Sequence, residues 1–182
     1  MKNKISKIIF ILIINFFLNS LSLSNEVFNF DVTEVEIVED GKKFLGKKGG
    51  IATSEDGVTI EAQNFEYDKI QNILIAHGDV VMNDKIKNIF IYSQKVIYYK
   101  NKELILTDGQ SKAINEDITI DAEKFEYNKI QNILNAKGDV KIDNKKDNYK
   151  IFSNEATYFK KKELFLTDGQ SKAINEDITI DA

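Results

Sequence analysis

The chain has 182 residues, with 29 Asp and Glu against 25 Lys, one His, and no Arg, Cys or Pro. An acidic chain without Arg is a poor candidate for binding nucleic acid, because basic side chains that neutralise phosphates supply most of that affinity. The absence of Cys excludes disulfide bonds and a lipid-modified amino-terminal cysteine.

Residues 1–24 have the layout of a secretory signal peptide. A basic head precedes an apolar run over residues 8–18, and small residues precede a cleavage site before Asn25. The apolar run is shorter than the roughly 20 residues that a helix needs to span a bilayer, which favours a cleaved peptide over an uncleaved anchor. We therefore expect export to the periplasm, with or without association with the outer membrane. The mature chain, residues 25–182, would carry a formal charge of −7, because three of the 25 Lys and none of the 29 acids lie in the signal peptide, leaving 22 − 29.

The remainder of the chain is built from a repeated unit. Residues 103–122 and 163–182 are identical at nineteen of twenty positions, and residues 65–74 recur with one change as 125–134, also at an offset of 60. A Tyr followed eleven positions later by a Gly recurs at Tyr67/Gly78, Tyr98/Gly109, Tyr127/Gly138 and Tyr158/Gly169. This spacing predicts modules of about 30 residues, paired into a double repeat, over one domain at residues 25–182. A repeated unit favours a repeated surface over a single active site.

The hydrophobic pattern predicts an all-β protein. Short alternations of apolar and polar residues are separated by clusters of Asn, Asp, Gly and Lys. Over residues 134–142 the even positions are apolar or Gly and the odd positions are polar, and residues 74–82 keep the same apolar phase. Residues 103–107 and 163–167 are apolar on both phases, so the pattern does not assign their inner face. Residues 26–57 are predicted to form a degenerate first module.

The interior of such a stack has two interpretations. Where one short strand leads to the next, as from Ala122 to Phe125, the apolar phase shifts by one position, which predicts a tight corner. Stacked modules of this kind enclose one continuous apolar strip. The strip is either the plain core of a closed solenoid or the wall of a groove held open for a lipid, and periodicity alone does not distinguish them.

Two consecutive modules carry a characteristic spacing of aromatic, apolar and Gly residues. The residues are Phe65-x-Tyr67 followed by Asn72-x-Leu74-x-Ala76-x-Gly78-Asp79-Val80, with Ser93, Val96, Tyr98 and Gly109 in the alternate half-repeat. Over residues 28–182 the chain resembles the organic-solvent-tolerance (OstA-like) family, which comprises periplasmic lipopolysaccharide-transport proteins and the amino-terminal domain of an outer-membrane lipopolysaccharide-assembly protein. The resemblance implies a repeat-built β-jellyroll (β-taco) with an open apolar groove, in which the acyl chains of lipid A lie inside while the sugars stay in water. It also implies head-to-tail β-strand addition, to other lipopolysaccharide-transport components or to further copies of this chain.

On this interpretation the lipid-binding residues are the apolar side chains of the inner face. They are Phe65, Tyr67, Leu74, Val80, Ile91, Tyr98, Phe125, Tyr127, Leu134, Val140, Ile151 and Tyr158. The protein would be a bridge or assembly component that moves lipopolysaccharide towards the outer membrane. The alternative is a structural or adhesive β-solenoid with a closed core, in which the facing aromatic rows pack against each other.

Nothing in the sequence predicts an enzyme, a cofactor or a metal site. The single histidine, His77, falls on the polar phase of its strand, and Lys137 takes its place one double repeat later. The Asp residues beside the repeated glycines are typical of turns. The acidic cluster at residues 115–117 is typical of a solvated loop. No nucleophile occurs in the sequence pattern together with a base and a group that would orient it.

Overall fold

A computed structural model of the chain describes residues 27–175 and 178–181. The predicted signal peptide, residues 1–24, lies outside the described residues. Across the described ranges, no helix is long and apolar enough to cross a membrane.

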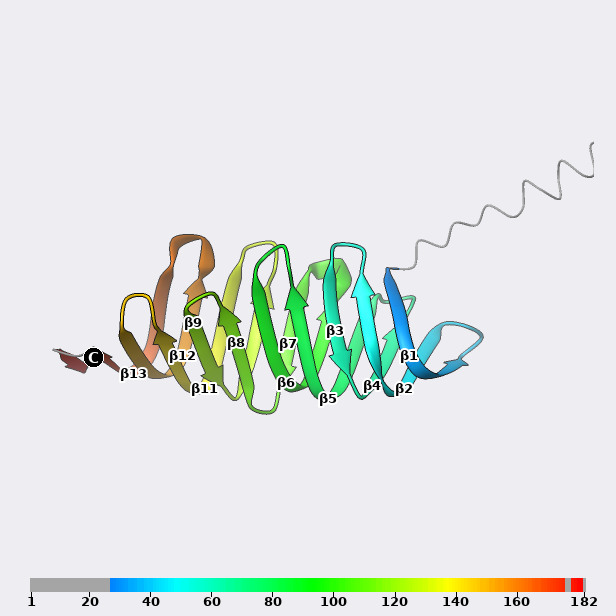
Figure 1. Cartoon of the computed structure of the whole chain (residues 1–182), viewed down its shortest axis with the longest axis horizontal. Helices are drawn as coiled ribbons and strands as arrows, with labels where there is room; N and C mark the ends of the chain where they lie inside the picture. The colour runs from blue at the N-terminus through cyan, green and yellow to red at the C-terminus, as the bar shows by residue number, and fades with distance from the viewer. Residues whose placement is uncertain (1–26, 176–177, 182) are drawn as a thin grey trace, which may run out of the picture.

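The described residues form one antiparallel sheet of fourteen strands and two short 3-10 turns, without an α-helix (Figure 1). The strands are β1 (Phe28–Val38), β2 (Lys43–Ser54), β3 (Val58–Ala62), β4 (Asn64–Asp68), β5 (Ile73–Asp84), β6 (Ile89–Tyr99), β7 (Leu104–Asp108), β8 (Ser111–Asn115), β9 (Ile118–Ala122), β10 (Lys124–Asn128), β11 (Ile133–Asn144), β12 (Tyr149–Phe159), β13 (Leu164–Asn175) and β14 (Thr179–Asp181). The 3-10 turns are η1 (Lys100–Lys102) and η2 (Lys160–Lys162). The bounds of β9 to β12 repeat those of β3 to β6 at an offset of 60. The all-β class predicted from the sequence is confirmed.

The sheet is folded along one line, so that each long strand belongs to two half-sheets. The register of the long strands is interrupted at this line, for example between His77 and Val80 in β5 and between Lys137 and Val140 in β11. Half-sheet 1 comprises β3, β8, β9, β14 and residues 28–32, 50–54, 80–84, 89–93, 140–144, 149–153 and 171–175. Half-sheet 2 comprises β4, β7, β10 and residues 34–38, 43–47, 73–77, 95–99, 133–137, 155–159 and 164–168. We call the line where they join the bend edge.

Glycines at the bend edge explain the constant Tyr-to-Gly spacing. Tyr127 pairs with Leu134 in half-sheet 2, and Gly138 follows at the end of that segment, where β11 turns into half-sheet 1. Gly138 has a φ of 78°, in the left-handed region that favours glycine, and Asp139 follows with a φ of 45°. Because two residues are bulged out together, the side chains before and after them keep the same inward phase. The Asp residues beside the glycines therefore take part in the bend, as expected for turn residues.

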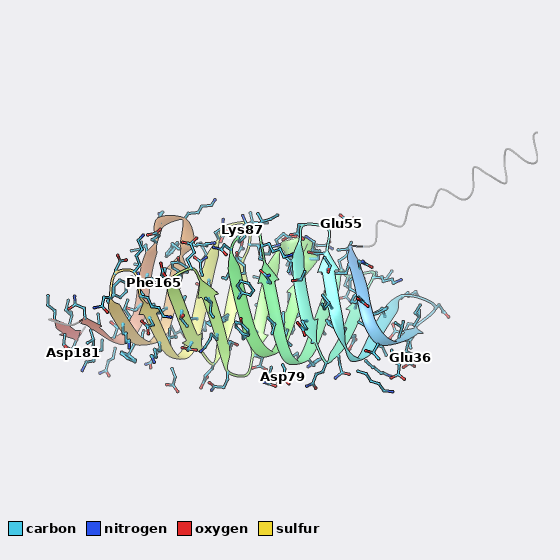
Figure 2. The ribbon with its side chains drawn as sticks, in the orientation of Figure 1. Glu36, Glu55, Asp79, Lys87, Phe165 and Asp181 are labelled. Carbon is cyan, nitrogen blue, oxygen red and sulfur yellow. The ribbon has the colours of Figure 1, made fainter. Side chains whose placement is uncertain are left out.

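The opposite long edge carries the hairpin turns of both half-sheets, and we call it the mouth edge. In half-sheet 2 the turns are residues 39–42, 69–72, 100–103, 129–132 and 160–163, and in half-sheet 1 they include residues 55–57, 85–88, 116–117 and 145–148. Figure 2 shows Glu55 and Lys87 at the mouth edge, at the top of the view, and Asp79 at the bend edge, at the bottom. The two half-sheets are therefore continuous along the bend edge, whereas along the mouth edge they meet only through side chains.

The inward faces of the two half-sheets supply one hydrophobic core that runs along the molecule. At the amino-terminal end this core is closed by aromatic rings. Phe30 stacks on Phe44 with ring centroids 4.1 Å apart, and Phe28 meets Tyr67 edge-on at 5.2 Å. Phe28 is 2% exposed, so β1 covers the interior at this end.

At the carboxy-terminal end the same inner face is exposed. Ile120 and Ile180 are equivalent residues of the identical repeat, but Ile120 is 2% exposed and Ile180 is 58% exposed. The difference arises from their neighbours, because β9 lies between β8 and β11, whereas β14 pairs with β13 alone among the described strands. Identical sequence is therefore buried in one copy and open in the other.

This contrast predicts that equivalent truncations have unequal effects. Ile120→Ala should lower the free energy of unfolding by about 2–5 kcal/mol, because it removes a fully buried side chain and leaves a cavity. Ile180→Ala should change it by less than about 0.5 kcal/mol, as expected for an exposed position. Urea denaturation of the two variants measures both values. Equal losses would show that the two copies have the same neighbours in solution.

Candidate functional site

The structure places all twelve predicted lipid-binding residues on the inner face. Eleven are buried members of the core, namely Phe65, Tyr67, Leu74, Val80, Ile91, Tyr98, Phe125, Tyr127, Leu134, Val140 and Tyr158, and Ile151 is partly buried against it. They come from both half-sheets, so they face one another across the interior. The outward positions between them are polar or partly exposed, as for Lys137, which pairs with Glu155 at 3.2 Å.

The interior is packed along the middle of the molecule and accessible at the carboxy-terminal end. Tyr98 is 0% exposed and Leu134 is 2% exposed, so side chains from the two half-sheets fill the space between them. Beyond β12 the inner face is less covered. Phe165 is half-buried and stacks on Tyr158 with ring centroids 4.5 Å apart, and Ile180 lies further along the same face.

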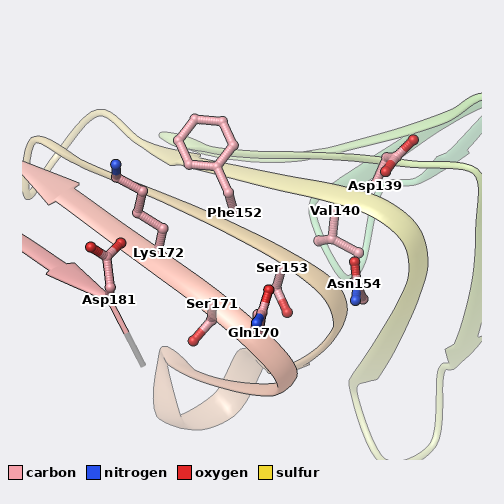
Figure 3. A pocket seen from close by; sticks show the side chains of 9 residues that line it. All are labelled: Asp139, Val140, Phe152, Ser153, Asn154, Gln170, Ser171, Lys172 and Asp181. Carbon is pink, nitrogen blue, oxygen red and sulfur yellow. The ribbon is translucent and has the colours of Figure 1, made fainter.

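A larger hollow near this end has a different character. Figure 3 shows its lining, which consists of Asp139, Val140, Phe152, Ser153, Asn154, Gln170, Ser171, Lys172 and Asp181. Its volume is about 790 Å³, but only Val140 and Phe152 of these nine residues are apolar. A lining that mixes polar and apolar surface suits an acyl chain less well than the buried inner face does.

A buried lysine joins the two half-sheets across the mouth edge. Lys129 begins the turn after β10 in half-sheet 2, and its side chain is 5% exposed. Its ammonium pairs with Asp56 of half-sheet 1, lies 3.6 Å from Asp84 of the same half-sheet, and pairs with Glu103 of half-sheet 2 at 2.8 Å. It also donates a hydrogen bond to the hydroxyl of Tyr98 at 3.0 Å.

Lys100 completes this group, which we call the Lys129 cluster (Asp56, Asp84, Tyr98, Lys100, Glu103 and Lys129). The Lys100 ammonium lies 3.1 Å from Asp56 and also pairs with Glu103, and the Tyr98 hydroxyl donates to Glu103 at 2.8 Å. Asp56 therefore receives ion pairs from two lysines of the opposite half-sheet. The cluster closes the mouth edge directly above the buried ring of Tyr98.

The charges of the cluster stabilise one another. Burial alone would raise the pKa of the Asp56 carboxyl, but hydrogen bonds from Lys129, Ser54 and Lys100 outweigh it and hold that pKa below its usual range. Burial would likewise raise the pKa of Glu103, and its bonds to the same two lysines and to Tyr98 lower it. Burial would lower the pKa of Lys129, but its hydrogen bonds to Asp56 and Glu103 raise it.

No sequence pattern predicts this cluster. Lys129 and Lys69 occupy equivalent places in the repeat and are both followed by Ile-Gln-Asn, yet Lys69 is exposed. The partner Asp56 lies 73 residues away in the chain, so no local pattern pairs it with Lys129. A repeat analysis finds equivalent lysines, but it does not show which of them meets carboxylates from the other half-sheet.

The remaining candidates from the sequence lie away from the inner face or form no cluster. His77 is exposed on the outer side of β5. Within the described ranges no three His, Asp or Glu residues are arranged to hold a metal ion.

Lys129→Met tests the contribution of the cluster to stability. Removing the ammonium leaves the buried carboxylate of Asp84 without its ion pair and leaves Asp56 and Glu103 with Lys100 alone. This should lower the free energy of unfolding by roughly 3 kcal/mol, at the low end for a buried ion pair because Asp56 and Glu103 keep some contact with water. Lys69→Met is the matched control, since it makes the same chemical change at the equivalent exposed position. A comparable loss in both variants would mean that Lys129 is not part of a buried cluster.

The depressed carboxyl pKa values predict the pH dependence of this contribution. A carboxyl whose pKa is lower in the folded state stabilises the fold above its unfolded pKa of about 4 and loses that contribution as the pH falls. The raised pKa of Lys129 preserves its own contribution until the pH exceeds about 10. The free energy of unfolding should therefore fall more steeply between about pH 5 and 3 in the wild type than in Lys129→Met. Parallel acid profiles would contradict the assignment.

Comparisons with known proteins give a structural relative. No family model matches the sequence, and no curated protein is significantly similar to it. Among solved structures, the fold is similar to that of LptH, the LptA-homologous periplasmic component of the conserved lipopolysaccharide transport device from Pseudomonas aeruginosa, with a TM-score of 0.56. The two sequences are 16% identical, and the match covers 61% of this chain and 82% of that one. This similarity confirms the jellyroll-like all-β fold expected from the sequence.

Proposed function

We propose that this protein is a periplasmic lipopolysaccharide-binding bridge or assembly component, which shields the acyl chains of the lipid between its half-sheets. The observation that carries the proposal is the continuous apolar inner face, which is joined on one side by the bend edge and is uncovered at the carboxy-terminal end around Phe165 and Ile180. The fold of a periplasmic lipopolysaccharide-transport component supports it.

Acyl chains would enter by separating the half-sheets at the mouth edge. The backbone is continuous at the bend edge, so the half-sheets have a natural hinge there. Shielding one acyl chain of about a dozen carbons is worth on the order of 10 kcal/mol, at about 0.8 kcal/mol per CH₂. Opening the Lys129 cluster lets water solvate its ammonium and carboxylate groups together, so it costs less than deleting one partner, and the lipid can offset the loss of this contact. Because hydrophobic attraction is non-directional, the lipid could move along the inner face without passing specific barriers.

The two ends of the sheet suit assembly by strand addition. In β1, Val35 is 52% exposed and Ile37 is 60% exposed, although they take the places of Phe125 and Tyr127 in the repeat register. In β13, residues 164–168 pair only with β12 among the described strands, and Leu166 is 53% exposed. Each edge offers backbone groups and apolar side chains to a further strand. The partners would be other lipopolysaccharide-transport components or further copies of this chain.

A closed-core structural or adhesive β-solenoid is the second candidate. It is favoured by the packing of the interior, where Tyr98 and Tyr127 are 0% and 1% exposed. In such a protein the facing rings would stay in contact permanently, and the exposed apolar end would serve assembly alone. The two functions differ in whether a lipid contacts the inner face.

Phe165→Asp tests the lipid contact where the inner face is accessible. A charge at this half-buried inward position should weaken binding of fluorescently labelled lipopolysaccharide about tenfold, since losing the equivalent of two buried CH₂ groups costs roughly 1.5 kcal/mol. Leu166→Asp is the matched control, because the adjacent residue points outward and is already 53% exposed. Equal affinities in the two folded variants would support the closed solenoid.

A further inference from the structure

The mouth edge carries a second site that corresponds to the Lys129 cluster one double repeat later. A cavity of about 90 Å³ is lined there by Asn115, Glu116, Asp117, Ile118, Asn144, Lys146, Tyr158, Lys160 and Glu163. At the offset of 60, Glu116 corresponds to Asp56, Tyr158 to Tyr98, Lys160 to Lys100 and Glu163 to Glu103. The described residues supply no counterpart to Lys129. We call this cavity the acceptor socket.

A ladder of backbone hydrogen bonds fixes where such a counterpart would lie. Along the mouth edge of half-sheet 2, the first residue of each turn donates its amide hydrogen to the carbonyl of the last residue of the preceding turn. The donor and acceptor pairs are Lys69 to Lys42, Lys100 to Asn72, Lys129 to Glu103 and Lys160 to Asn132, at 2.9–3.1 Å. The same pattern would place the first turn residue of a module added to β13 beside the carbonyl of Glu163, as Lys129 lies beside Glu103.

The charges in the acceptor socket suit an added ammonium. Its lining has three carboxylates, Glu116, Asp117 and Glu163, against two lysines, so one negative charge is in excess. Among the described residues, Glu163 has one ion-pair contact, to Lys146 at 3.6 Å. Lys160 makes no ion pair within the described parts of the chain, unlike its counterpart Lys100, and burial lowers its pKa.

From this correspondence we propose that the acceptor socket receives the first-turn lysine of a β-module that adds to residues 164–168 of β13. The partner is a strand–turn–strand unit of the type formed by residues 123–144, with a lysine where this chain has Lys129. The lysine would join Glu116 and Glu163 across the mouth edge, as Lys129 joins Asp56 and Glu103. This inference rests on the end-to-end assembly proposed above, and it names the chemistry of the partner.

The acceptor socket also discriminates against the first module of this chain. In β1 and β2, Ile37 pairs with Phe44 as Tyr127 pairs with Leu134, so the first turn residue of this module is Glu39. Docked on β13, Glu39 would bring a fourth carboxylate to the three of the acceptor socket. Like charges held close together oppose association. The geometry therefore favours a lysine-bearing partner over a second copy.

The test exchanges the turn at residues 39–42 in the mature chain. In the lysine graft, Glu39→Lys, Asp40→Ile, Gly41→Gln and Lys42→Asn reproduce the turn that begins with Lys129. The matched control graft keeps Glu39 and carries the other three substitutions, so the two proteins differ at one residue. Sedimentation velocity without lipopolysaccharide should show self-association at least about tenfold stronger for the lysine graft, and Glu163→Gln in that graft should remove most of the gain.

Equal association of the two grafts, including no association of either, would overturn the proposal. A gain that survives Glu163→Gln would also overturn it, because the lysine would then act outside the acceptor socket. Since lipid is absent from this experiment, either failure leaves the Phe165→Asp test of lipid binding unaffected.

Discussion

The interrupted register at the bend edge is the constraint on which the rest of the structure depends. Glycines such as Gly138 allow a long strand to leave one half-sheet and enter the other without losing its inward phase. Repeating that device along the chain turns a single antiparallel sheet into two facing walls with one shared apolar interior. The two half-sheets are joined differently along their two long edges. The backbone connects them at the bend edge, whereas only side-chain contacts join them at the mouth edge. Any separation of the half-sheets would therefore occur at the mouth edge.

The Lys129 cluster closes the mouth edge with ionic contacts, and their nature bears on the proposed lipid binding. If apolar side chains replaced the Lys129 cluster, hydrophobic contacts would close the mouth edge. An acyl chain could then bind nonspecifically to those side chains at the edge. An ion pair instead is directional and is lost as a unit once the half-sheets separate and water enters. Hydrophobic contacts thus stabilise the interior, whereas ion pairs of the Lys129 cluster close the mouth edge. The acceptor socket extends the same ionic arrangement to the next position along the mouth edge, where a partner would have to supply the lysine.

Much of the fold could be predicted because it follows from the local alternation of apolar and polar residues. The alternation over residues 134–142, the phase shift before Phe125 and the Tyr-to-Gly spacing all follow from a period of two that is interrupted at a corner. Residues 103–107 are ambiguous in the sequence, since both phases are apolar. The structure turns Ile105 and Thr107 inward, while Leu104 and Leu106 are partly exposed on the outer side. The candidate site was predicted only as an inner face. Whether that face is packed, and which lysine closes the mouth edge, depends on residues 73 positions apart in the chain, for which periodicity carries no information.

The most direct test of the account is photo-crosslinking in cells that make lipopolysaccharide, with a benzophenone amino acid at position 134 and, separately, at position 137. Leu134 is an inward residue at 2% exposure in the packed middle of the interior, and Lys137 lies three residues along the same strand on the outer side. If the half-sheets part to admit acyl chains, a lipopolysaccharide adduct forms at position 134 and none forms at position 137. A folded, exported protein that gives no adduct at either position would contradict this account and would identify a closed core.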